Sequence, residues 1–331
     1  MRLLFIRFSS IGDIVLTSPA IRCAKMQIPG VEIHFLTKSS MKDLVVANPY
    51  IHSVHCLEDT IEATVAPLKK IQFDYIIDLH HNQRTWRIKR ALGVPAYSYN
   101  KLSIKKWLLA LTKINLLPVS HVCERYVQTL LPLGVSNDDK GLDYFLPTSD
   151  FSVENILPSQ FHAGYTALVI GASYETKKMP IQKWIELCEK INGPIVVVGD
   201  KDDYENAQIL VNNFTEKVFN ACGKYSLNES ALFIKKSRLV ISHDTGFLHV
   251  AVAFNKPTIT IWGATSPVLQ FEAYYAKDVQ TKRMNAIVPN LSCQPCSKQG
   301  GHKCPKGHFK CMQLQDTNAI VLFANANSAH I

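Results

Sequence analysis

The residues best suited to chemistry form the stretch His243-Asp244-Thr245-Gly246, which follows a short apolar run. Asp244 or Thr245 can cap a helix that begins there, and the free N–H groups of a helix N-terminus attract anions. Gly246 lets a phosphate approach the backbone, because glycine has no Cβ. His249 lies one helical turn further along the same face. The stretch predicts a diphosphate cradle, although His249 alone is equally typical of a core histidine bonded to backbone.

A second set of candidate residues occupies the loop 171–180, after the apolar run 165–170. Ser173, Lys177 and Lys178 lie in this loop, and a lysine there can neutralise a phosphate as a point charge. The alternative is a solvated surface lysine. Gly199 follows the next apolar run, 194–198, and predicts a turn.

A third candidate is Asp13, in Ser9-Ser10-Ile11-Gly12-Asp13, directly after the apolar run 3–8. An acid in the first turn of a helix stabilises the helix dipole, which is the simplest explanation of Asp13. An aspartate with an ordinary pKa of about 3.9 is also ionised at neutral pH and can accept a proton. We expect a turn at Gly12 to hold Asp13 at a ligand cleft.

The elements that must position these residues alternate between strand and helix patterns. The apolar runs 3–8, 31–37 and 75–79 are interleaved with helical spacing such as 14–26. After the polar interval 147–164 the alternation restarts, with further expected elements at 165–170, 182–191, 194–198, 204–212, 239–242 and 258–262. The pattern predicts two open α/β sheets, with ligands beyond the carboxyl ends of the strands.

Composition limits the class of protein. The 331 residues are 47% hydrophobic and 19% charged, which is typical of a globular protein with two domains. No run of about 18 apolar residues predicts a spanning helix, and the N-terminal residues lack a signal-peptide pattern, so we expect a cytoplasmic protein. Five of the nine cysteines are isolated in apolar surroundings, where we expect free thiols: Cys23, Cys56, Cys123, Cys188 and Cys222.

The net charge of +9 is concentrated in one segment. Between Leu79 and Cys123 there is no acid, while Arg84, Arg87, Lys89, Arg90, Lys101, Lys105, Lys106 and Lys113 are all cationic. Such a field attracts an anionic partner: nucleic acid, a phosphorylated substrate or an anionic membrane. Within this segment Ile104, Trp107, Leu108, Leu111 and Ile114 or Asn115 recur at helical spacing. They predict an amphipathic basic helix, which either lies on a membrane or packs on its own core with a solvated lysine face.

The tail from 291 to 313 carries Cys293, Cys296, Cys304 and Cys311, with His302 and His308 nearby. These residues could hold a structural zinc ion, but six residues separate the last two cysteines, so a packed knuckle of reduced thiols is the alternative. The sequence has neither a GxGxxG after the first apolar run nor a GxxxxGK[ST] motif, which argues against dinucleotide oxidoreductases and P-loop NTPases.

The motifs together resemble the ADP-heptose:lipopolysaccharide heptosyltransferases of glycosyltransferase family 9, over nearly the full chain. The resemblance rests on SSIGD, on Lys177-Lys178-Met179-Pro180, on Gly199, and on ISHDTGFLHVAVAFNKPTITIWGATSP from Ile241 to Pro267. Three positions depart from the usual pattern of the family: Met179 stands for a tryptophan, His243 for an asparagine and Phe247 for a proline. They flank the donor site and put the identity of the nucleotide or sugar in question.

The resemblance implies a GT-B fold, in which two Rossmann-like domains face a central cleft. The expected domains are 1–155, which binds the acceptor, and 156–331, which binds the nucleotide-sugar and carries the Cys-rich tail and a terminal helix that could return to the first domain. The implied roles are catalysis by Asp13 and Lys177; donor binding by Ser173, Lys177, Gly199, Asp244, Thr245, Gly246 and His249; and acceptor binding by Ser10, Gly12, Asp13 and Arg84.

The implied reaction is a metal-independent, inverting transfer of heptose or a related sugar from ADP-heptose to an inner-core lipopolysaccharide or similar surface glycan. No metal ligand and no cofactor beyond this donor are expected. The implied partners are a nucleotide-sugar and a lipid-linked anionic glycan, with peripheral contact at the inner face of the inner membrane. The alternatives are a GT-B enzyme that uses a GDP- or UDP-sugar, a nucleotide-sugar epimerase, and a basic nucleic-acid-binding protein, which the lack of aromatic residues on a strand platform disfavours.

Overall fold

The structure is a computed structural model and describes residues 1–328. The chain forms two compact units, which we treat separately. Unit 1 comprises residues 1–101, 119–148 and 276–278, and unit 2 comprises 102–118, 149–275 and the rest of the described chain from 279. The division is therefore not a single cut: the segment 102–118 groups with unit 2, and 276–278 groups with unit 1.

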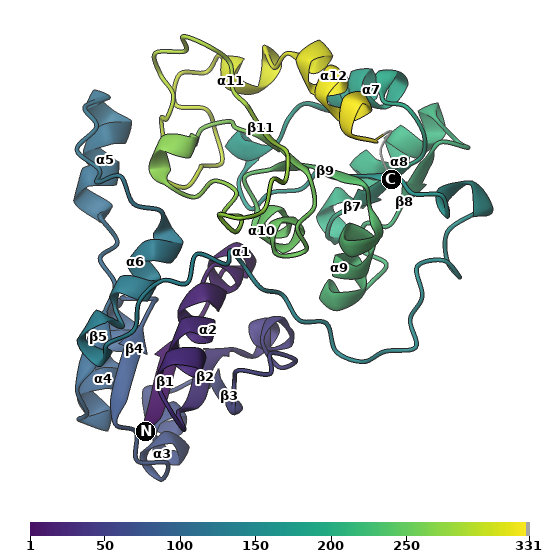
Figure 1. The fold of residues 1–331 in the computed structure, drawn as a ribbon. Helices are drawn as coiled ribbons and strands as arrows, with labels where there is room; N and C mark the ends of the chain where they lie inside the picture. The colour runs from purple at the N-terminus through teal and green to yellow at the C-terminus, as the bar shows by residue number, and fades with distance from the viewer. Residues whose placement is uncertain (329–331) are drawn as a thin grey trace. The chain divides into compact units, whose positions relative to one another are not determined.

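Unit 1 is built on a five-stranded, fully parallel sheet with the order β3-β2-β1-β4-β5 (Figure 1). Its strands are β1 (Arg2–Ile6), β2 (Glu32–Lys38), β3 (Ser53–Leu57), β4 (Tyr75–Asp78) and β5 (Ala96–Ser98). Its helices are α1 (Ile11–Val15), α2 (Ser18–Gln27), α3 (Ile61–Lys69), α4 (Gln83–Leu92) and α6 (Val122–Gln128), with 3₁₀ turns at Ser39–Leu44 and Leu131–Leu133. Leu3 to Ile6 of β1 are fully buried, as expected for a parallel strand covered on both faces.

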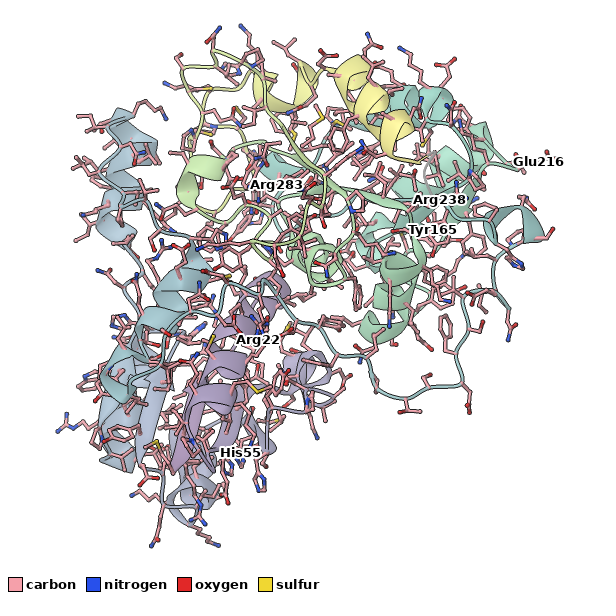
Figure 2. All side chains as sticks on the ribbon, viewed as in Figure 1. Arg22, His55, Tyr165, Glu216, Arg238 and Arg283 are labelled. Atoms are coloured by element: carbon pink, nitrogen blue, oxygen red, sulfur yellow. The ribbon has the colours of Figure 1, made fainter. Side chains whose placement is uncertain are left out.

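Helices α1 and α2 replace the single helix expected over 14–26. Pro19 is the reason for the break, because it has no N–H to donate to the carbonyl of Val15. Proline is instead well suited to the first turn of a helix, where Pro19 stands in α2. On the same helix, Arg22 contacts both carboxylate oxygens of Asp138 at 2.8 Å and also Asp143, which ties the chain after α6 to α2 (Figure 2).

Unit 2 is built on a six-stranded, fully parallel sheet with the order β11-β10-β9-β6-β7-β8 (Figure 1). Its strands are β6 (Thr166–Val169), β7 (Ile195–Val198), β8 (Val218–Asn220), β9 (Leu239–His243), β10 (Thr258–Ile261) and β11 (Arg283–Ala286). Its helices are α5 (Ser103–Thr112), α7 (Ile181–Lys190), α8 (Tyr204–Asn213), α9 (Leu227–Lys236), α10 (Gly246–Ala253), α11 (Lys310–Gln313) and α12 (Thr317–Ser328), with 3₁₀ turns at Ser159–Phe161, Glu175–Lys177, Lys201–Asp203 and Pro267–Leu269. The terminal helix α12 packs on α7 within unit 2.

Both sheets have the strand order of a doubly wound Rossmann fold, in which the chain starts in the middle of the sheet and then reverses direction. The reversal lies between β1 and β4 in unit 1, and between β6 and β9 in unit 2. Ligands of such folds bind outside the carboxyl ends of the strands at this point. The residues after these four strands are therefore the first places to look for a site.

Candidate functional site

In unit 2 the loops after β6 and β9 are joined by an ion pair between Lys177 and Asp244. The Lys177 Nζ donates to Asp244 Oδ2 at 2.7 Å and to the Asp244 carbonyl at 3.0 Å. The hydroxyl of the buried Thr265, after β10, donates to the same Oδ2 at 2.9 Å. Both charged side chains are largely buried, with 14% and 11% exposed. Three loops thus fix one ammonium group at the switch point of the sheet.

Helix α10 begins next to this pair with an open N-terminus. Thr245 is its N-cap residue, but the side chain makes no capping hydrogen bond, so the expected cap is absent. Within the described residues, the N–H groups of Gly246, Phe247 and Leu248 have no hydrogen-bond acceptor. An eight-residue helix with free N–H groups presents a partial positive charge at this end. His249 is buried one turn into the same helix.

Gly263 is the first residue of the Gly-x-Thr-x-Pro turn at 263–267, after β10. Close packing explains why this position is a glycine. A Cβ added to Gly263 would lie 2.3 Å from the Thr176 carbonyl oxygen, which no side chain can tolerate. The next residue, Ala264, donates its N–H to that same oxygen at 3.0 Å. The glycine therefore lets the β10 loop approach the residue that precedes Lys177, and two positions later Thr265 reaches Asp244.

Gly199 and Ser173 also lie at this edge of the sheet, after β7 and β6. Asp203 fills the space beside two glycines: an added Cβ at Gly171 would meet its Oδ2 at 1.9 Å, and one at Gly199 at 2.7 Å. Burial, together with the neighbouring Asp200, raises the pKa of Asp203 to about 6. Ser173 is exposed in the loop. Gly199 therefore has a packing role, and Ser173 is accessible to a ligand.

Two of the three positions that depart from the family pattern, His243 and Met179, are joined by a hydrogen bond. The Met179 N–H donates to His243 Nε2 at 2.9 Å, and His243 Nδ1 lies 3.3 Å from the Gly171 carbonyl. Burial lowers the pKa of His243 to about 4, so the ring is neutral and can accept one bond while it donates the other. The two residues are buried and connect the β9 and β6 loops, which gives them a structural role.

In unit 1, Asp13 follows β1 and lies in the first turn of α1. Ser10 is the N-cap, and its N–H and hydroxyl both donate to Asp13 Oδ2, at 3.2 and 3.0 Å. Arg7, which is buried, donates to the same oxygen at 2.6 Å. Gly12 is helical and buried inside α1, so the turn expected at Gly12 is wrong.

The environment of Asp13 keeps it ionised and leaves one oxygen open. Burial favours the neutral acid, but the Arg7 charge and the bonds from Ser10 outweigh it and hold the Asp13 pKa below its usual range. Every bond to Asp13 within the described residues goes to Oδ2. With 26% of the side chain exposed, Oδ1 is the oxygen that a ligand hydroxyl can approach.

Arg84 lies in the first turn of α4, after β4, which is the neighbour of β1 in the sheet. Its side chain is exposed. Arg84 and Asp13 therefore follow adjacent strands at the same sheet edge. His80, which the sequence reasoning did not select, lies in the loop between β4 and α4 and contacts Phe8. Burial lowers its pKa to about 4, and its Nδ1 has no hydrogen-bond partner in the described part of the chain.

Comparison with known proteins decides the family. The family model described as glycosyltransferase family 9 (heptosyltransferase) matches residues 63–305, well over half of the chain. The chain belongs to glycosyltransferase family 9. A curated relative, lipopolysaccharide heptosyltransferase 1 of Campylobacter coli, is 25% identical, and the match covers 80% of this chain and 84% of the relative.

Solved structures give the same fold. A glycosyltransferase family 9 protein from Veillonella parvula superposes with a TM-score of 0.76 at 18% identity, over 98% of this chain and 96% of that one. The E. coli heptosyltransferase WaaC with ADP-2-deoxy-2-fluoro heptose superposes with a TM-score of 0.67 at 20% identity, over 99% and 100%. The predicted GT-B fold and the glycosyltransferase activity are confirmed. The family match includes Lys177 and Asp244 but begins after Asp13.

Helix α5, which lies in the basic segment, does not pack its apolar face on its own core. In α5 the apolar residues Ile104, Trp107 and Leu111 are 82%, 57% and 64% exposed. Lys106, expected on a solvated face, is instead buried with its Nζ 4.0 Å from the centre of the Phe271 ring. The expectation that α5 packs its apolar face on its own core is wrong, and the exposed stripe needs another explanation.

The Cys-rich tail is hydrogen-bonded to the loops after β6 and β10. Gln294 Nε2 donates to the carbonyls of Trp262, Gly263 and Thr265, at 3.2, 2.7 and 3.0 Å. The Gly301 N–H donates to the Thr176 hydroxyl at 2.8 Å, and the Gly301 carbonyl accepts from the Thr176 N–H at 3.0 Å. All nine cysteines are free thiols.

The four tail cysteines lie near one another, since Cys293, Cys296 and Cys304 all contribute to the raised pKa of Cys311. Among residues 1–328, no three of their sulfurs and the nearby histidine nitrogens lie within 4.8 Å of one another. Burial raises the pKa of Cys311 to about 12 and that of Cys296 as well, so these groups are neutral thiols. A zinc site and a packed knuckle of reduced thiols therefore both stay predictions for this tail.

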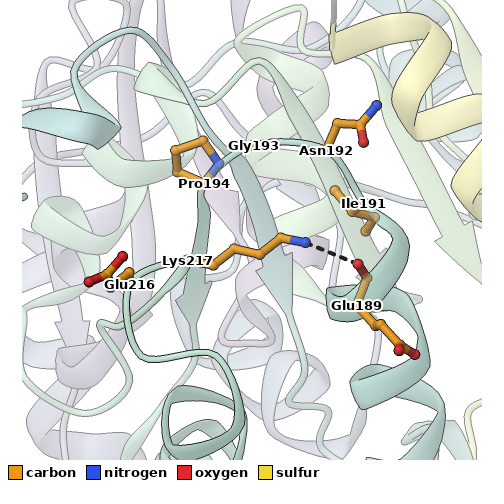
Figure 3. A pocket seen from close by; sticks show the side chains of 7 residues that line it. All are labelled: Glu189, Ile191, Asn192, Gly193, Pro194, Glu216 and Lys217. Carbon is orange, nitrogen blue, oxygen red and sulfur yellow. Dashed lines mark hydrogen bonds between the residues drawn. The ribbon is translucent and has the colours of Figure 1, made fainter.

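A surface pocket of about 430 Å³ lies elsewhere in unit 2 (Figure 3). Its lining comes from the end of α7 and from the residues before β7 and β8, at the amino ends of these strands. Lys217 Nζ donates to the Glu189 carbonyl across it at 3.3 Å. The pocket is thus at the opposite edge of the sheet from Lys177 and Asp244.

Several residues of the site were missed from the sequence: Arg7, His80, Asp203, Gly263 and Thr265. Arg7 directly follows the last residue of β1 within the run 3–8, and His80 directly follows the run 75–79. Both are at strand ends, where ligand residues concentrate, so position alone could have found them. The role of Asp203 depends on the packing of Gly171 and Gly199, and no local pattern shows that.

Proposed function

We propose that this protein transfers heptose from ADP-heptose to an inner-core lipopolysaccharide acceptor, with inversion at the anomeric carbon. The observation that carries the proposal is the Lys177–Asp244 pair beside the open N-terminus of α10. Membership of the heptosyltransferase family and the likeness to a structure with an ADP-heptose analogue support the choice of donor. A GDP- or UDP-sugar is the alternative.

We assign donor binding to unit 2, largely the expected domain 156–331. A lysine ammonium has three N–H groups, and Asp244 accepts two of them, which leaves the third for a phosphate oxygen. The α10 N–H groups at Gly246 would bind the other phosphate oxygens, with Thr245 and His249 in the same turn and Ser173 and Gly199 at the rim. Charge grows on the diphosphate as it leaves, so these fixed groups stabilise the transition state more than the ground state.

We assign acceptor binding and proton acceptance to unit 1, largely the expected domain 1–155. Asp13 Oδ1 takes the proton of the acceptor hydroxyl while that oxygen bonds to the anomeric carbon, and the bond to the diphosphate breaks to release ADP. Because one displacement inverts the carbon, one base is enough. Ser10 and Gly12 position Asp13 through α1, and the exposed Arg84 is suited to an acceptor phosphate. The step uses no metal ion.

The donor assignment is tested by thermal shift with ADP-, GDP- and UDP-sugars at equal concentrations. A ligand that binds only the folded state raises the melting temperature according to its affinity. We expect ADP-heptose and ADP to stabilise the protein and the GDP and UDP compounds to have little effect. Stabilisation by a GDP- or UDP-sugar but not by ADP would overturn the donor assignment and leave the fold unaffected.

We further propose that α5 attaches the protein peripherally to the inner face of the inner membrane, where a lipid-linked acceptor would lie, so that the reaction is cytoplasmic. Among the described residues, no helix combines the length and apolar content needed to span a bilayer. The exposed stripe of Ile104, Trp107 and Leu111, with Lys105 exposed beside it, has the character of a helix that lies in the interface of an anionic membrane.

Vesicle co-sedimentation tests this attachment. The double variant Trp107→Ser/Leu111→Ser should lose most binding to vesicles that contain phosphatidylglycerol, because it removes the apolar face without a change of charge. Leu322→Ser is the matched control, since Leu322 on α12 is equally exposed, at 73%. Equal binding by the double variant and the control would contradict the proposal.

A further inference from the structure

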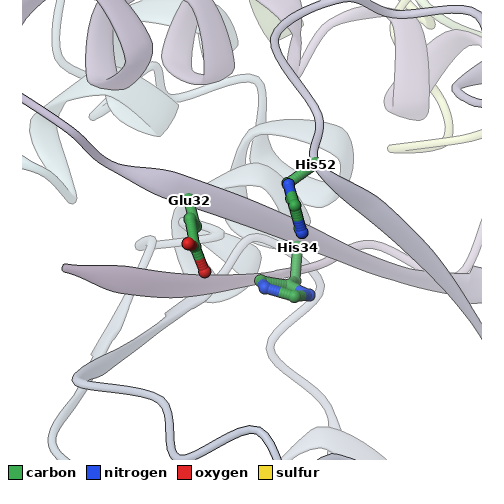
Figure 4. Close-up of side chains that lie close together, drawn as sticks. All are labelled: Glu32, His34 and His52. Carbon is green, nitrogen blue, oxygen red and sulfur yellow. The ribbon is translucent and has the colours of Figure 1, made fainter.

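Three side chains at the amino end of the unit 1 sheet form a cluster that the transfer reaction does not use. Glu32 and His34 stand two residues apart on β2, so they share a face, and His52 immediately precedes β3 (Figure 4). One ligand atom from each lies within 4.8 Å of the others. The His52 N–H donates to the Ile33 carbonyl at 2.7 Å, which fixes the backbone of one ligand to the strand of the other two.

His34 carries the most informative atom of the cluster. The residue is 95% buried, since 5% of it is exposed, and its Nε2 has no hydrogen-bond partner in the described part of the chain. A buried nitrogen without a partner is unfavourable, because it has lost its hydrogen bonds to water and gained none in the protein. Such an orphan in a well-packed protein indicates an atom or ion that the protein alone does not supply.

The other ring nitrogen of His34 is held by a second histidine. His34 Nδ1 lies 3.0 Å from His55 Nε2, and the two rings stack with their centres 5.3 Å apart. When His34 Nδ1–H donates to His55, Nε2 of His34 carries the free lone pair. Metal-bound histidines are oriented in this way, with the second nitrogen bonded to a neighbouring group. His55 is on β3 and is labelled in Figure 2.

The charges of the cluster suit a cation. Burial and the neighbouring His55 and His52 lower the pKa of His34 to about 4, so the ring is neutral at neutral pH and its lone pair is available. The Arg2 guanidinium donates to Glu32 Oε2 at 2.9 Å and, with this hydrogen bond as the largest cause, lowers the Glu32 pKa. Glu32 Oε1 remains as the carboxylate ligand. The Arg2 guanidinium, which is paired with this carboxylate, opposes a cation.

The geometry points to a binding site for a divalent first-row transition ion, zinc above all, formed by Glu32, His34 and His52. Two histidines and one glutamate are a ligand set of zinc sites that keep a fourth position open. The zinc distances of about 2.0–2.2 Å place ligand atoms roughly 3.3 Å apart, so the cluster must contract. His52 is exposed and can rotate toward His34 and Glu32.

The site is separate from the transfer chemistry. Glu32 and His52 lie at the amino ends of β2 and β3, whereas Asp13 and Arg84 follow the carboxyl ends of β1 and β4. Bound metal would join the start of β2 to the start of β3, which is the edge strand of the sheet. We therefore expect bound metal to stabilise the pairing of β2 with the edge strand β3.

The test is equilibrium dialysis of the untagged, reduced full chain against ZnCl₂, with the wild type and with Glu32→Gln and His52→Ala. Both substitutions are at accessible positions, so the fold should persist. We expect one zinc per chain at micromolar concentration and a loss of affinity of at least about tenfold in each variant, since each removes one of three ligands. His162→Ala is the matched control, because His162 is exposed in unit 2, and it should bind as the wild type does.

A second measurement separates this site from the tail thiols. Cobalt in place of zinc should give only weak visible bands, as expected for nitrogen and oxygen ligands, and Cys293→Ser should leave them unchanged. Arg2→Gln should tighten zinc binding, because it removes the opposing charge. An intense thiolate band that Cys293→Ser abolishes, zinc affinity equal in the wild type and His52→Ala, or no zinc bound at all, would each overturn the proposal.

Discussion

The ion pairs at the two switch points have opposite arrangements. In unit 1 a buried arginine, Arg7, holds a carboxylate and leaves Asp13 Oδ1 open. In unit 2 a carboxylate, Asp244, holds a lysine and leaves an N–H of Lys177 open beside the N–H groups of α10. The same Rossmann topology thus presents an acceptor of protons in one unit and donors to an anion in the other. The difference supports the proposal that the two units supply the two halves of a transfer reaction.

The contrast between the two ion pairs predicts its largest effect for a change at Asp13. Asp13→Asn should lower turnover by about 10²–10⁴-fold, because the amide cannot accept the proton. The thermal shift caused by ADP should stay that of the wild type, since Asp13 belongs to unit 1. Asp74→Asn, elsewhere in unit 1, serves as the control. Near-normal turnover in Asp13→Asn would place the base on another residue.

The matching change in unit 2 is Lys177→Met, which removes the charge and keeps the length of the side chain. We expect kcat/KM to fall by about 10²–10³-fold, as for other lost electrostatic stabilisers. The thermal shift with ADP should also decrease. Lys178→Met controls for a general loss of charge, because Lys178 pairs with Glu175 at 2.9 Å. Equal effects of the two lysine variants would contradict the assigned role.

Gly263→Ala tests the packing behind Lys177. Its Cβ would displace the Thr176 carbonyl and with it the residue that follows, so ADP affinity should weaken by about tenfold, which is about 1.4 kcal/mol. Gly301→Ala provides the control, since an added Cβ there has its nearest neighbour at 3.8 Å. Isothermal titration with ADP measures both, and equal affinities would show that the close approach does not matter.

The smallest effect concerns Asp203. An acid whose pKa rises on folding to about 6 contributes stability that is complete below its ordinary pKa of 3.8 and lost as the pH rises through 6. Asp203→Asn should therefore raise the melting temperature at pH 7.5, by roughly 2–4 °C for each 1 kcal/mol gained. The gain should vanish near pH 4. A gain that does not depend on pH would show that the Asp203 charge is not its cause.

Much of this arrangement was predictable from the sequence, and the rest depends on packing. Apolar runs located β1, β2, β4, β6, β7, β9 and β10, because strands buried on both faces leave continuous apolar segments. The partly exposed β3, β5 and β11 lack such runs. The break at Pro19 was visible in the sequence but was not used.

In the candidate site, too, local motifs were predictable from the sequence and contacts between distant residues were not. Lys177, Asp244 and Asp13 were selected from local motifs, but the partners that hold two of them, Thr265 and Arg7, were not. Thr265 comes from a loop 21 residues after Asp244, and only the sheet order brings it there. For a similar reason the sequence did not decide between the two alternatives for α5. Periodicity shows that a helix has an apolar face, but not what covers it.

The most direct test of the central claim is to incubate the protein with ADP-heptose and a lipopolysaccharide acceptor that ends before the first heptose. Mass spectrometry and NMR of the product follow. We predict an acceptor heavier by one heptose, one ADP per transfer, and an anomeric configuration opposite to that of the donor. Release of ADP without a heavier acceptor, retention of configuration, or transfer only from a GDP- or UDP-sugar would contradict the account.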